Sequence, residues 1–172
     1  MRQICDPRYE WGCRDDRGVG GLPMMELATV QSHAAVVGIT ALAVIACIFL
    51  HYESLSFLTI ILKRMHTRAR PRILLLIFAI LFTHVLEIWI FGLAYYFLIS
   101  TEGHGALIAQ YPLGLLDCVY YSAVCFTTLG LGDVVPAGPV RFLTGTETLT
   151  GFVLITWSAS FTFIEMQRFW KN

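Results

Sequence analysis

The run of residues 127–133, Thr-Thr-Leu-Gly-Leu-Gly-Asp, has the residue types and spacing that most directly predict a chemical role. Gly130 and Gly132 are separated by one residue, and glycine adopts positive φ without a Cβ penalty, so this backbone can alternate between right- and left-handed conformations. Successive carbonyls can then face one axis. If four chains place the run around that axis, rings of carbonyl oxygens, with the Thr128 hydroxyl innermost, replace the hydration shell of a monovalent cation. The run therefore predicts a selectivity filter.

A lone G-x-G also occurs in turns and phosphate loops, so the surrounding sequence has to support this interpretation. A Rossmann or Walker motif requires a preceding strand and a soluble α/β chain, and the sequence indicates neither. Instead, the apolar run 113–126 is too short to cross a membrane and leads directly into the glycines. Irregular backbone at membrane depth is tolerated only where it is buried in protein or lines a water-filled cavity. We therefore predict a re-entrant pore helix followed by a filter.

The run resembles the T-V-G-Y-G-D signature of the potassium channel family, with Leu129 at the valine position and Leu131 where an aromatic residue is usual. Tyr120, Tyr121 and Ser122 resemble the aromatic pair and serine of that family's pore helix. The resemblance extends from the second apolar span to the carboxyl terminus. It implies passive potassium transport by a homotetramer, with potassium as the permeant ligand and no cofactor.

The resemblance also implies roles for individual residues. Potassium is expected at the carbonyls of Thr128, Leu129, Gly130 and Leu131, with Gly132 completing the ion-binding segment. Asp133 belongs at the outer mouth, with Glu102 and Asp117 as further acids there. The expected filter supports are Tyr120, Tyr121 and Thr127.

Two departures from the family pattern lead to specific expectations. Leu131 lacks the ring that packs against pore-helix aromatics in the family, so a weakly selective monovalent cation channel is an alternative. Val124 stands where some members carry a glutamate behind the filter. Tyr120 is therefore expected to donate its hydroxyl to Asp133 in a charge-assisted hydrogen bond.

The composition predicts a membrane protein, because 56% of the residues are hydrophobic and only 14% are charged. The formal net charge of zero, and the lack of a Lys/Arg cluster interleaved with aromatic residues on a soluble face, argue against nucleic-acid binding. The polar residues suggest no nucleophile and base, so we expect no enzyme. The five cysteines form no C-x-x-C pair and give no sign of a zinc site; Cys5 and Cys13 could be bridged outside the cell.

The first part of the chain is expected to hold one membrane-crossing helix. The expected parts are a flexible tail at residues 1–28, a first transmembrane helix at residues 29–62 and a basic loop at residues 63–72. Short loops rich in Lys and Arg stay cytoplasmic, which places the amino terminus and the filter outside. His51 and Glu53, near the end of the first uncharged run, are interpreted as interfacial groups reaching toward the headgroups, with a functional site as the alternative.

Residues 73–166 are expected to form the pore domain. Its parts are an outer helix at 73–100, a pore helix at 113–127, the filter at 128–133 and an inner helix at 141–166, followed by a cytoplasmic end at 167–172. The inner helix carries many hydroxyl residues, which suggests that one face meets protein or water. Candidate cavity or gating residues on it are Gly151, Phe152, Ile155 and Ala159. Gly151 fits a hinge and a close helix contact equally well.

Three ionisable residues within the predicted spans are candidate modulators. His84 and Glu87 are three residues apart and share a helix face, as a structural pair or as a proton sensor. Glu147 is expected to pair with Arg141 or with a pore-helix group.

Together these features predict an all-α membrane protein with three transmembrane helices, a re-entrant pore helix and a filter, assembling as a tetramer among membrane lipids. The predicted location is the plasma membrane, with the 63–72 loop and the carboxyl terminus in the cytoplasm. A non-conducting subunit that keeps the pore architecture is a second alternative.

Overall fold

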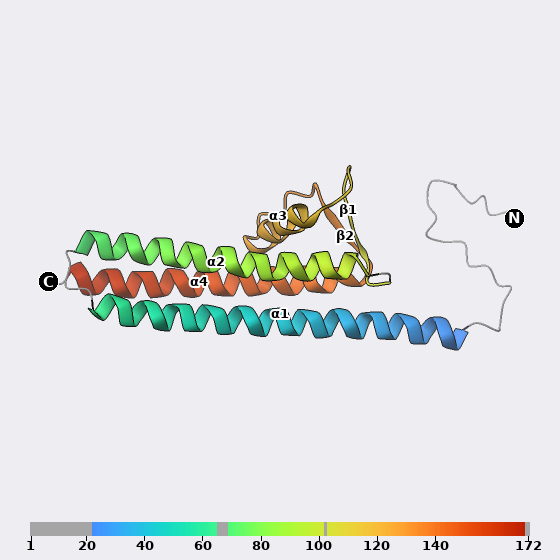
Figure 1. The fold of residues 1–172 in the computed structure, drawn as a ribbon, viewed down its shortest axis with the longest axis horizontal. Coiled ribbons are helices and arrows are strands. Elements are labelled where there is room, and N and C mark those ends of the chain that lie inside the picture. Colours follow the sequence, from blue (N-terminus) through green and yellow to red (C-terminus); the bar gives the residue numbers. More distant parts are fainter. Residues whose placement is uncertain (1–21, 65–68, 102, 171–172) are drawn as a thin grey trace, which may run out of the picture.

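Three long helices dominate the structure, a computed structural model that describes residues 22–64, 69–101 and 103–170 (Figure 1). They are α1 (Leu22–Arg64), α2 (Ala69–Ile99) and α4 (Arg141–Trp170). Each contains a segment long and apolar enough to cross a membrane. The prediction of three membrane-crossing helices is therefore confirmed.

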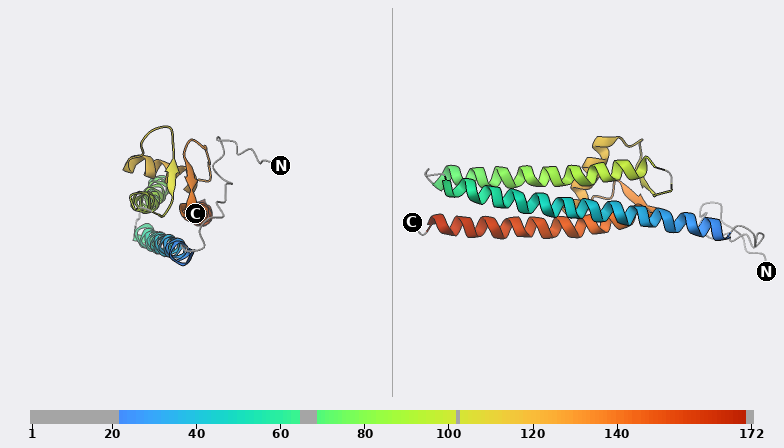
Figure 2. Two further views of the ribbon diagram at one scale, coloured as in Figure 1. Left: turned by 90° about the vertical axis from the view of Figure 1, so that its right-hand side faces the viewer. Right: turned by 60° about the horizontal axis from the view of Figure 1, so that its bottom comes forward.

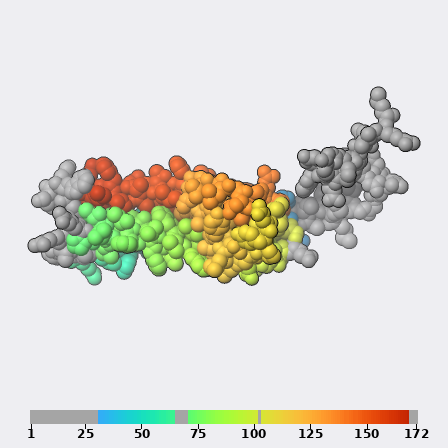
Figure 3. Space-filling model, turned by 90° about the horizontal axis from the view of Figure 1, so that it is seen from above, coloured from blue at the N-terminus to red at the C-terminus, as the bar shows by residue number. Residues whose placement is uncertain are grey.

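The three helices run side by side, and a short helix lies on one side of them. This short helix, α3 (Leu115–Phe126), packs against α2 and α4. Seen from the end, α1 packs against α2 and α4 on the side away from α3 (Figure 2). In the space-filling view, α3 and the segment after it cover one end of the α2 and α4 pair and leave the other end open (Figure 3).

The part of the bundle that carries α3 lies away from the end at which α1 ends, α2 begins and α4 ends (Figure 1). At about 1.5 Å per residue, the 12 residues of α3 extend for only about 18 Å, whereas the hydrocarbon core is about 30 Å thick. A helix of this length enters from one side and cannot cross. This is the geometry of a re-entrant helix.

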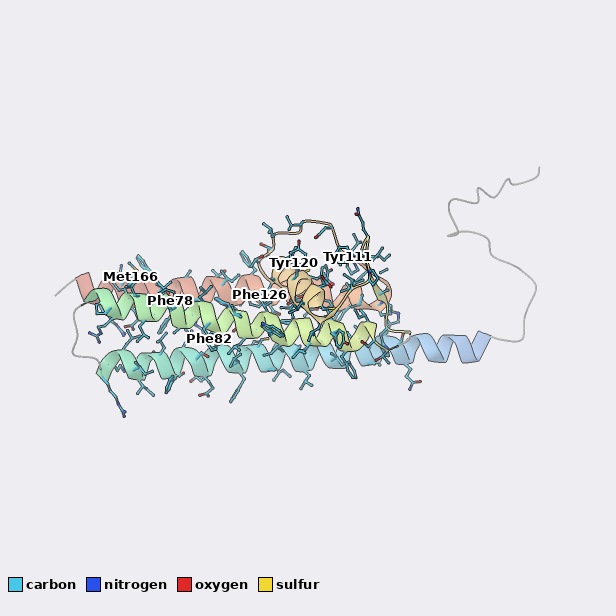
Figure 4. All side chains as sticks on the ribbon, turned by 45° about the horizontal axis from the view of Figure 1, so that its top comes forward. Phe78, Phe82, Tyr111, Tyr120, Phe126 and Met166 are labelled. Atoms are coloured by element: carbon cyan, nitrogen blue, oxygen red, sulfur yellow. The ribbon has the colours of Figure 1, made fainter. Side chains whose placement is uncertain are left out.

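Buried residues from all four helices form one continuous core around the contact between α2, α3 and α4. Apolar exposure is extensive outside this core; Phe78 and Phe82 of α2, for example, are 66% and 63% exposed (Figure 4). Such surfaces are stable in lipid or against further protein but not in water. The core includes Val36, Ala43, Cys47, Phe91, Tyr95, Leu98, Cys118, Tyr121, Phe126, Leu143 and Leu154.

A small antiparallel sheet was not predicted from the sequence. Its strands are β1 (Ala106–Ile108), in the segment expected to be a loop, and β2 (Val135–Ala137), directly after the filter segment. A short 3-10 turn, η1 (Gly138–Val140), leads from β2 into α4. The sheet ties the α2–α3 connection to the chain leaving the filter, so both ends of the re-entrant segment are fixed to each other.

The helix boundaries differ from the expected ones in two places. The first helix begins at Leu22, so residues 22–28 are helical and not part of a tail; residues 1–21 lie outside the described residues. In the basic segment 63–72, residues 63–64 and 69–72 are helical, since α1 continues to Arg64 and α2 begins at Ala69; residues 65–68 lie outside the described residues. Helices commonly extend beyond the apolar run, because their backbone bonds are made internally in water and in lipid alike.

The hydroxyl groups of α4 meet protein in part, as the sequence suggested, since Thr150 and Ser158 are buried and Thr144 bonds to Tyr95 and Tyr121. Most of them donate to the carbonyl four residues earlier in the same helix, as Thr148 does to Thr144 at 2.9 Å. Hydroxyls satisfied in this way do not require water or a protein partner. The same bond is made by Thr144, Thr146, Thr150, Thr156, Ser160 and Thr162.

Candidate functional site

The candidate filter, residues 128–133, emerges from the carboxyl end of α3. The amides of Thr127, Thr128 and Leu129 fold back onto the last turn and donate to carbonyls at 3.1, 2.9 and 2.9 Å. At the opposite end of α3, the Gly114 amide donates to the Asp117 carboxylate at 2.7 Å and so caps the helix. Asp117 thus acts as a helix cap; Glu102, the other expected acid, lies outside the described residues.

The backbone of the candidate filter alternates in handedness. Positive φ occurs at every second residue, with 59° at Thr128, 60° at Gly130 and 80° at Gly132, while Leu129 and Leu131 are not in that region. An alternation of this kind is what turns successive carbonyls toward one side. Among the described non-glycine residues, only Thr128 has positive φ, and for a β-branched residue this costs roughly 1–3 kcal/mol. The sequence predicted a role for the Thr128 hydroxyl, whereas the strained backbone of Thr128 was not predicted.

The candidate filter has little covering from its own chain. Every residue from Thr127 to Asp133 is exposed, and the Leu129 and Leu131 side chains are 64% and 57% exposed. A hollow of about 310 Å³ lies behind the segment, between it, α3 and α4. Irregular backbone next to lipid requires a protein or water partner, which the single chain does not supply.

A hydrogen bond joins the pore helix to the end of the candidate filter. The Tyr120 hydroxyl donates to the Asp133 carboxylate at 2.8 Å, which is the bond expected from the missing glutamate at Val124. This bond raises the pKa of the Tyr120 phenol above its ordinary value of 10.0, because ionised Tyr120 would face the Asp133 carboxylate without a proton to share. Tyr120 lies on the outward side of α3 (Figure 4).

Behind α3, a buried carboxylate connects three helices. Glu147 of α4 is 0% exposed and accepts hydrogen bonds from Tyr95 of α2 at 2.6 Å and from Ser122 of α3 at 2.5 Å. Tyr121 stacks edge-on against Tyr95, with ring centroids 5.0 Å apart, and bonds to the Thr144 hydroxyl at 3.2 Å. Of the two partners foreseen for Glu147, the pore-helix group is the one observed. Tyr95 was not foreseen, because an isolated tyrosine in an apolar run gives no sign of its partner.

Gly151 lies where α4 touches the end of α3. A Cβ atom added there would lie 2.2 Å from the carbonyl oxygen of Phe126, the last residue of α3. The structure thus gives Gly151 a packing reason to be glycine and places it in the core rather than on a cavity wall. Thr127 likewise bonds to its own helix, at the Ala123 carbonyl 2.7 Å away, and not to the candidate filter.

The other inner-helix candidates lie on exposed parts of α4. Phe152 and Ile155 are 59% and 38% exposed, and Ala159 is exposed as well. Ile155 and Ala159 line a groove of about 510 Å³ between α2 and α4. Their exposure leaves them free to face a central cavity in an assembly.

His84 and Glu87 are bonded to each other, at 2.8 Å from His84 Nδ1 to one carboxylate oxygen. The other oxygen lies 2.9 Å from Nδ1 of His51 on α1. The expectation that His51 reaches toward the headgroups is wrong, since its side chain is 1% exposed; Glu53 is exposed. The only sign of this contact in the sequence is a polar residue next to an apolar run, and that sign does not identify the partner helix.

The helices α2 and α4 can each cross a membrane, and between them in the chain lie the re-entrant helix α3 and a glycine-bearing segment with alternating backbone handedness. This arrangement defines the pore module of a membrane channel. A family model described as an ion channel matches residues 72–168, from the first turn of α2 almost to the end of α4. The match covers more than half of the chain, so the chain belongs to this ion channel family. The first helix, α1, precedes the matched region. Neither curated proteins nor solved structures gave a match.

Proposed function

We propose that four copies of the chain assemble around a central axis and conduct potassium ions passively across a membrane. The observation that supports this most directly is the alternating backbone at Thr128, Gly130 and Gly132. One chain contributes one such segment, and a ring of coordinating carbonyls needs several. Cyclic symmetry brings identical segments together. The uncovered filter residues and the exposed apolar faces of α2 and α4 are consistent with such an assembly.

Within this assembly, the carbonyls of Thr128, Leu129, Gly130 and Leu131, together with the Thr128 hydroxyl, take the place of water around the ion. Asp133 sits at the outer mouth, where its charge raises the local cation concentration. The bond from Tyr120 holds the Asp133 carboxylate in position. The carboxyl end of α3 points its partial negative charge toward the cavity below the filter, which favours a cation there.

The orientation follows from the charges. The basic residues at the end of α1 and the start of α2 lie at one end of the bundle, and α3 with the candidate filter lies toward the other (Figure 1). By the positive-inside rule, the basic end is cytoplasmic, so the filter opens to the outside of the plasma membrane and the carboxyl terminus lies in the cytoplasm. This orientation is the one in which the filter meets external cations first.

The test is ion flux through the purified protein in liposomes, with reversal potentials recorded under potassium and sodium gradients. The proposal predicts a current whose reversal potential follows the potassium gradient. Gly130→Ala is expected to abolish it, because φ at this position is +60°, where an L-residue is strained. Gly38→Ala is the matched control, since a Cβ there meets nothing within 4 Å. Absence of flux through the wild-type tetramer would instead favour a non-conducting subunit.

A weakly selective monovalent cation channel is a second candidate, and one observation favours it. The hollow of about 310 Å³ behind Gly130 and Gly132 is not filled by an aromatic ring from position 131, because that residue is leucine and points outward with 57% exposure. A filter without lateral packing can adapt its width to sodium. A reversal potential that responds equally to both gradients would identify this candidate.

A further inference from the structure

A second polar cluster lies in the apolar part of the bundle, away from the candidate filter. It is formed by His51 of α1 with His84 and Glu87 of α2; we call these three residues the His–Glu cluster. The two histidines approach opposite oxygens of one carboxylate, at 2.9 Å for His51 and 2.8 Å for His84. Their potential ligand atoms all lie within 4.8 Å of one another.

The cluster is sealed from water on most sides. The side chains of Glu87 and His51 are 0% and 1% exposed, and that of His84 is 15% exposed. Aromatic rings form part of the wall, with Trp157 centred 5.2 Å from the His51 ring and Phe126 centred 5.8 Å from the His84 ring. A carboxylate in such surroundings is costly unless a positive charge or several donors compensate it.

The donor set and its geometry fit a divalent transition metal. Zinc is bound by two imidazoles and one carboxylate in known three-ligand sites, which leave a fourth position for water or another small ligand. In a tetrahedral site with bonds of about 2.0–2.2 Å, neighbouring ligand atoms lie roughly 3.3–3.6 Å apart, so the contacts of 2.9 and 2.8 Å have to open by only about 0.5 Å to admit the ion. His84 and Glu87 share one helix face, so α2 supplies two of the three ligands already aligned.

A supporting contact has the arrangement that metal-bound histidines usually show. Both histidines turn Nδ1 toward the carboxylate, which leaves Nε2 as the second nitrogen. Nε2 of His51 lies 3.4 Å from the hydroxyl of Ser158 on α4. When Nδ1 binds a metal, Nε2 carries the proton and can donate it to this hydroxyl, which fixes the tautomer and the ring.

The cluster also has a route of access. His84 and Ser158 line the groove of about 510 Å³ between α2 and α4, so the more exposed histidine borders an open space. The remaining lining is almost entirely apolar, which makes the imidazole the main polar feature at the inner end of that groove. An ion that reaches the groove therefore finds its first ligand there.

From these observations we propose that His51, His84 and Glu87 form a binding site for a divalent transition metal ion, with zinc as the best match. The bound ion joins α1, which precedes the region of the family match, to α2 of the pore module. The site does not depend on ion conduction. It would exist in a protein that conducts no ions, so its test is separate from that of the proposed function.

The test measures zinc content in the purified full-length protein. The protein is stripped with a chelator, exposed to zinc, freed of loose ions and examined by atomic emission, with thermal unfolding recorded in parallel. We expect about one zinc ion per chain and a higher unfolding temperature with zinc than without it. Cobalt in place of zinc should give the visible absorption of a tetrahedral site.

Two replacements of His84 separate a metal ligand from a hydrogen-bonding group. His84→Gln keeps a donor for the carboxylate but removes the imidazole ligand, so zinc should be lost. His84→Cys supplies another zinc ligand, so zinc should be retained. His104→Gln, in the loop after α2, is the control and should bind as the wild type does. Ser158→Ala should weaken binding about 10-fold.

Two results would overturn the proposal. One is a folded wild-type protein that retains no zinc, in which case the cluster is held by hydrogen bonds and protons alone. The other is equal zinc retention by the wild type and His84→Gln, which would place the zinc elsewhere. The wild-type measurement needs no variant to fold, so the first result is decisive even if a substitution disrupts the bundle.

Discussion

Replacing Gly151 by alanine tests the contact between the inner helix and the end of the pore helix. The added Cβ would lie 2.2 Å from the Phe126 carbonyl oxygen, 2.8 Å from its carbonyl carbon and 2.9 Å from its Cα. All three atoms belong to the backbone, so a side-chain rotation cannot relieve the overlap. One helix has to move by roughly 1 Å to restore an ordinary contact distance.

The magnitude follows from comparison with Gly145→Ala on the same helix, where a Cβ meets nothing within 4 Å. Both substitutions gain about 1 kcal/mol of helix propensity. Only Gly151→Ala carries the overpacking cost, typically about 1–3 kcal/mol. We therefore expect Gly151→Ala to be less stable than Gly145→Ala by about 1–3 kcal/mol.

The assay is thermal unfolding of both variants in the same detergent, where 1 kcal/mol corresponds to about 2–4 °C for a chain of this size. A hinge that merely needs flexibility at Gly151 predicts the opposite sign, because alanine would then stabilise the helix as it does at position 145. Equal stabilisation of the two variants would refute the packing argument. Since Phe126 directly precedes the segment that enters the filter, lower ion flux is expected along with lower stability.

Three further predictions concern the hydrogen bonds and the filter. Tyr120→Phe should shorten the open periods of the channel, whereas Tyr96→Phe should leave them unchanged. The bond to Asp133 raises the pKa of Tyr120, so the stabilisation from this bond is complete below pH 10 and is lost as the pH rises through the raised pKa. Alkaline pH should therefore affect conduction by the wild type but not by Tyr120→Phe. Glu147→Ala should lower the free energy of unfolding by about 2–5 kcal/mol. Glu147→Gln should lower it by less, because glutamine keeps one acceptor for the Tyr95 and Ser122 hydroxyls. Equal losses in the two variants would contradict the hydrogen-bond network around Glu147. Leu131→Tyr should raise the potassium-to-sodium permeability ratio measured from reversal potentials. An unchanged ratio would show that the side chain at position 131 does not determine selectivity.

Much of the fold could be predicted from local sequence. The three spans follow from their apolar length, and α3 follows from an apolar run too short to cross that ends in a G-x-G. The bond from Tyr120 to Asp133 could also be predicted, because the two residues are 13 positions apart and Val124 stands where some family members have a glutamate to pair with the acid. These features depend on neighbours in sequence or on a known pattern.

Features that depend on contacts between distant helices could not be predicted in the same way. His51 and Glu87 are 36 residues apart, and Tyr95 and Glu147 are 52 residues apart. An apolar helix shows little contrast between its faces, because lipid-facing and core-facing positions are both hydrophobic. Periodicity therefore does not reveal which face of α1 packs inward. The short sheet was missed for a related reason, since strands of three residues carry too little pattern to be recognised.

The two buried carboxylates, Glu87 and Glu147, are the centres of two separate hydrogen-bond networks in the bundle. Glu147 joins α2, α3 and α4 behind the candidate filter, whereas Glu87 joins α1 to α2 and, through the bond between His51 and Ser158, approaches α4. Among the described residues, no side chain is hydrogen-bonded to both carboxylates. A carboxylate in an apolar bundle loses more free energy from losing its partners than a surface carboxylate does, because no water replaces them. The first network therefore holds the pore helix against α2 and α4, and the second holds the additional helix against α2. Phe126 lies between them, because its ring packs on His84 and its carbonyl oxygen meets Gly151.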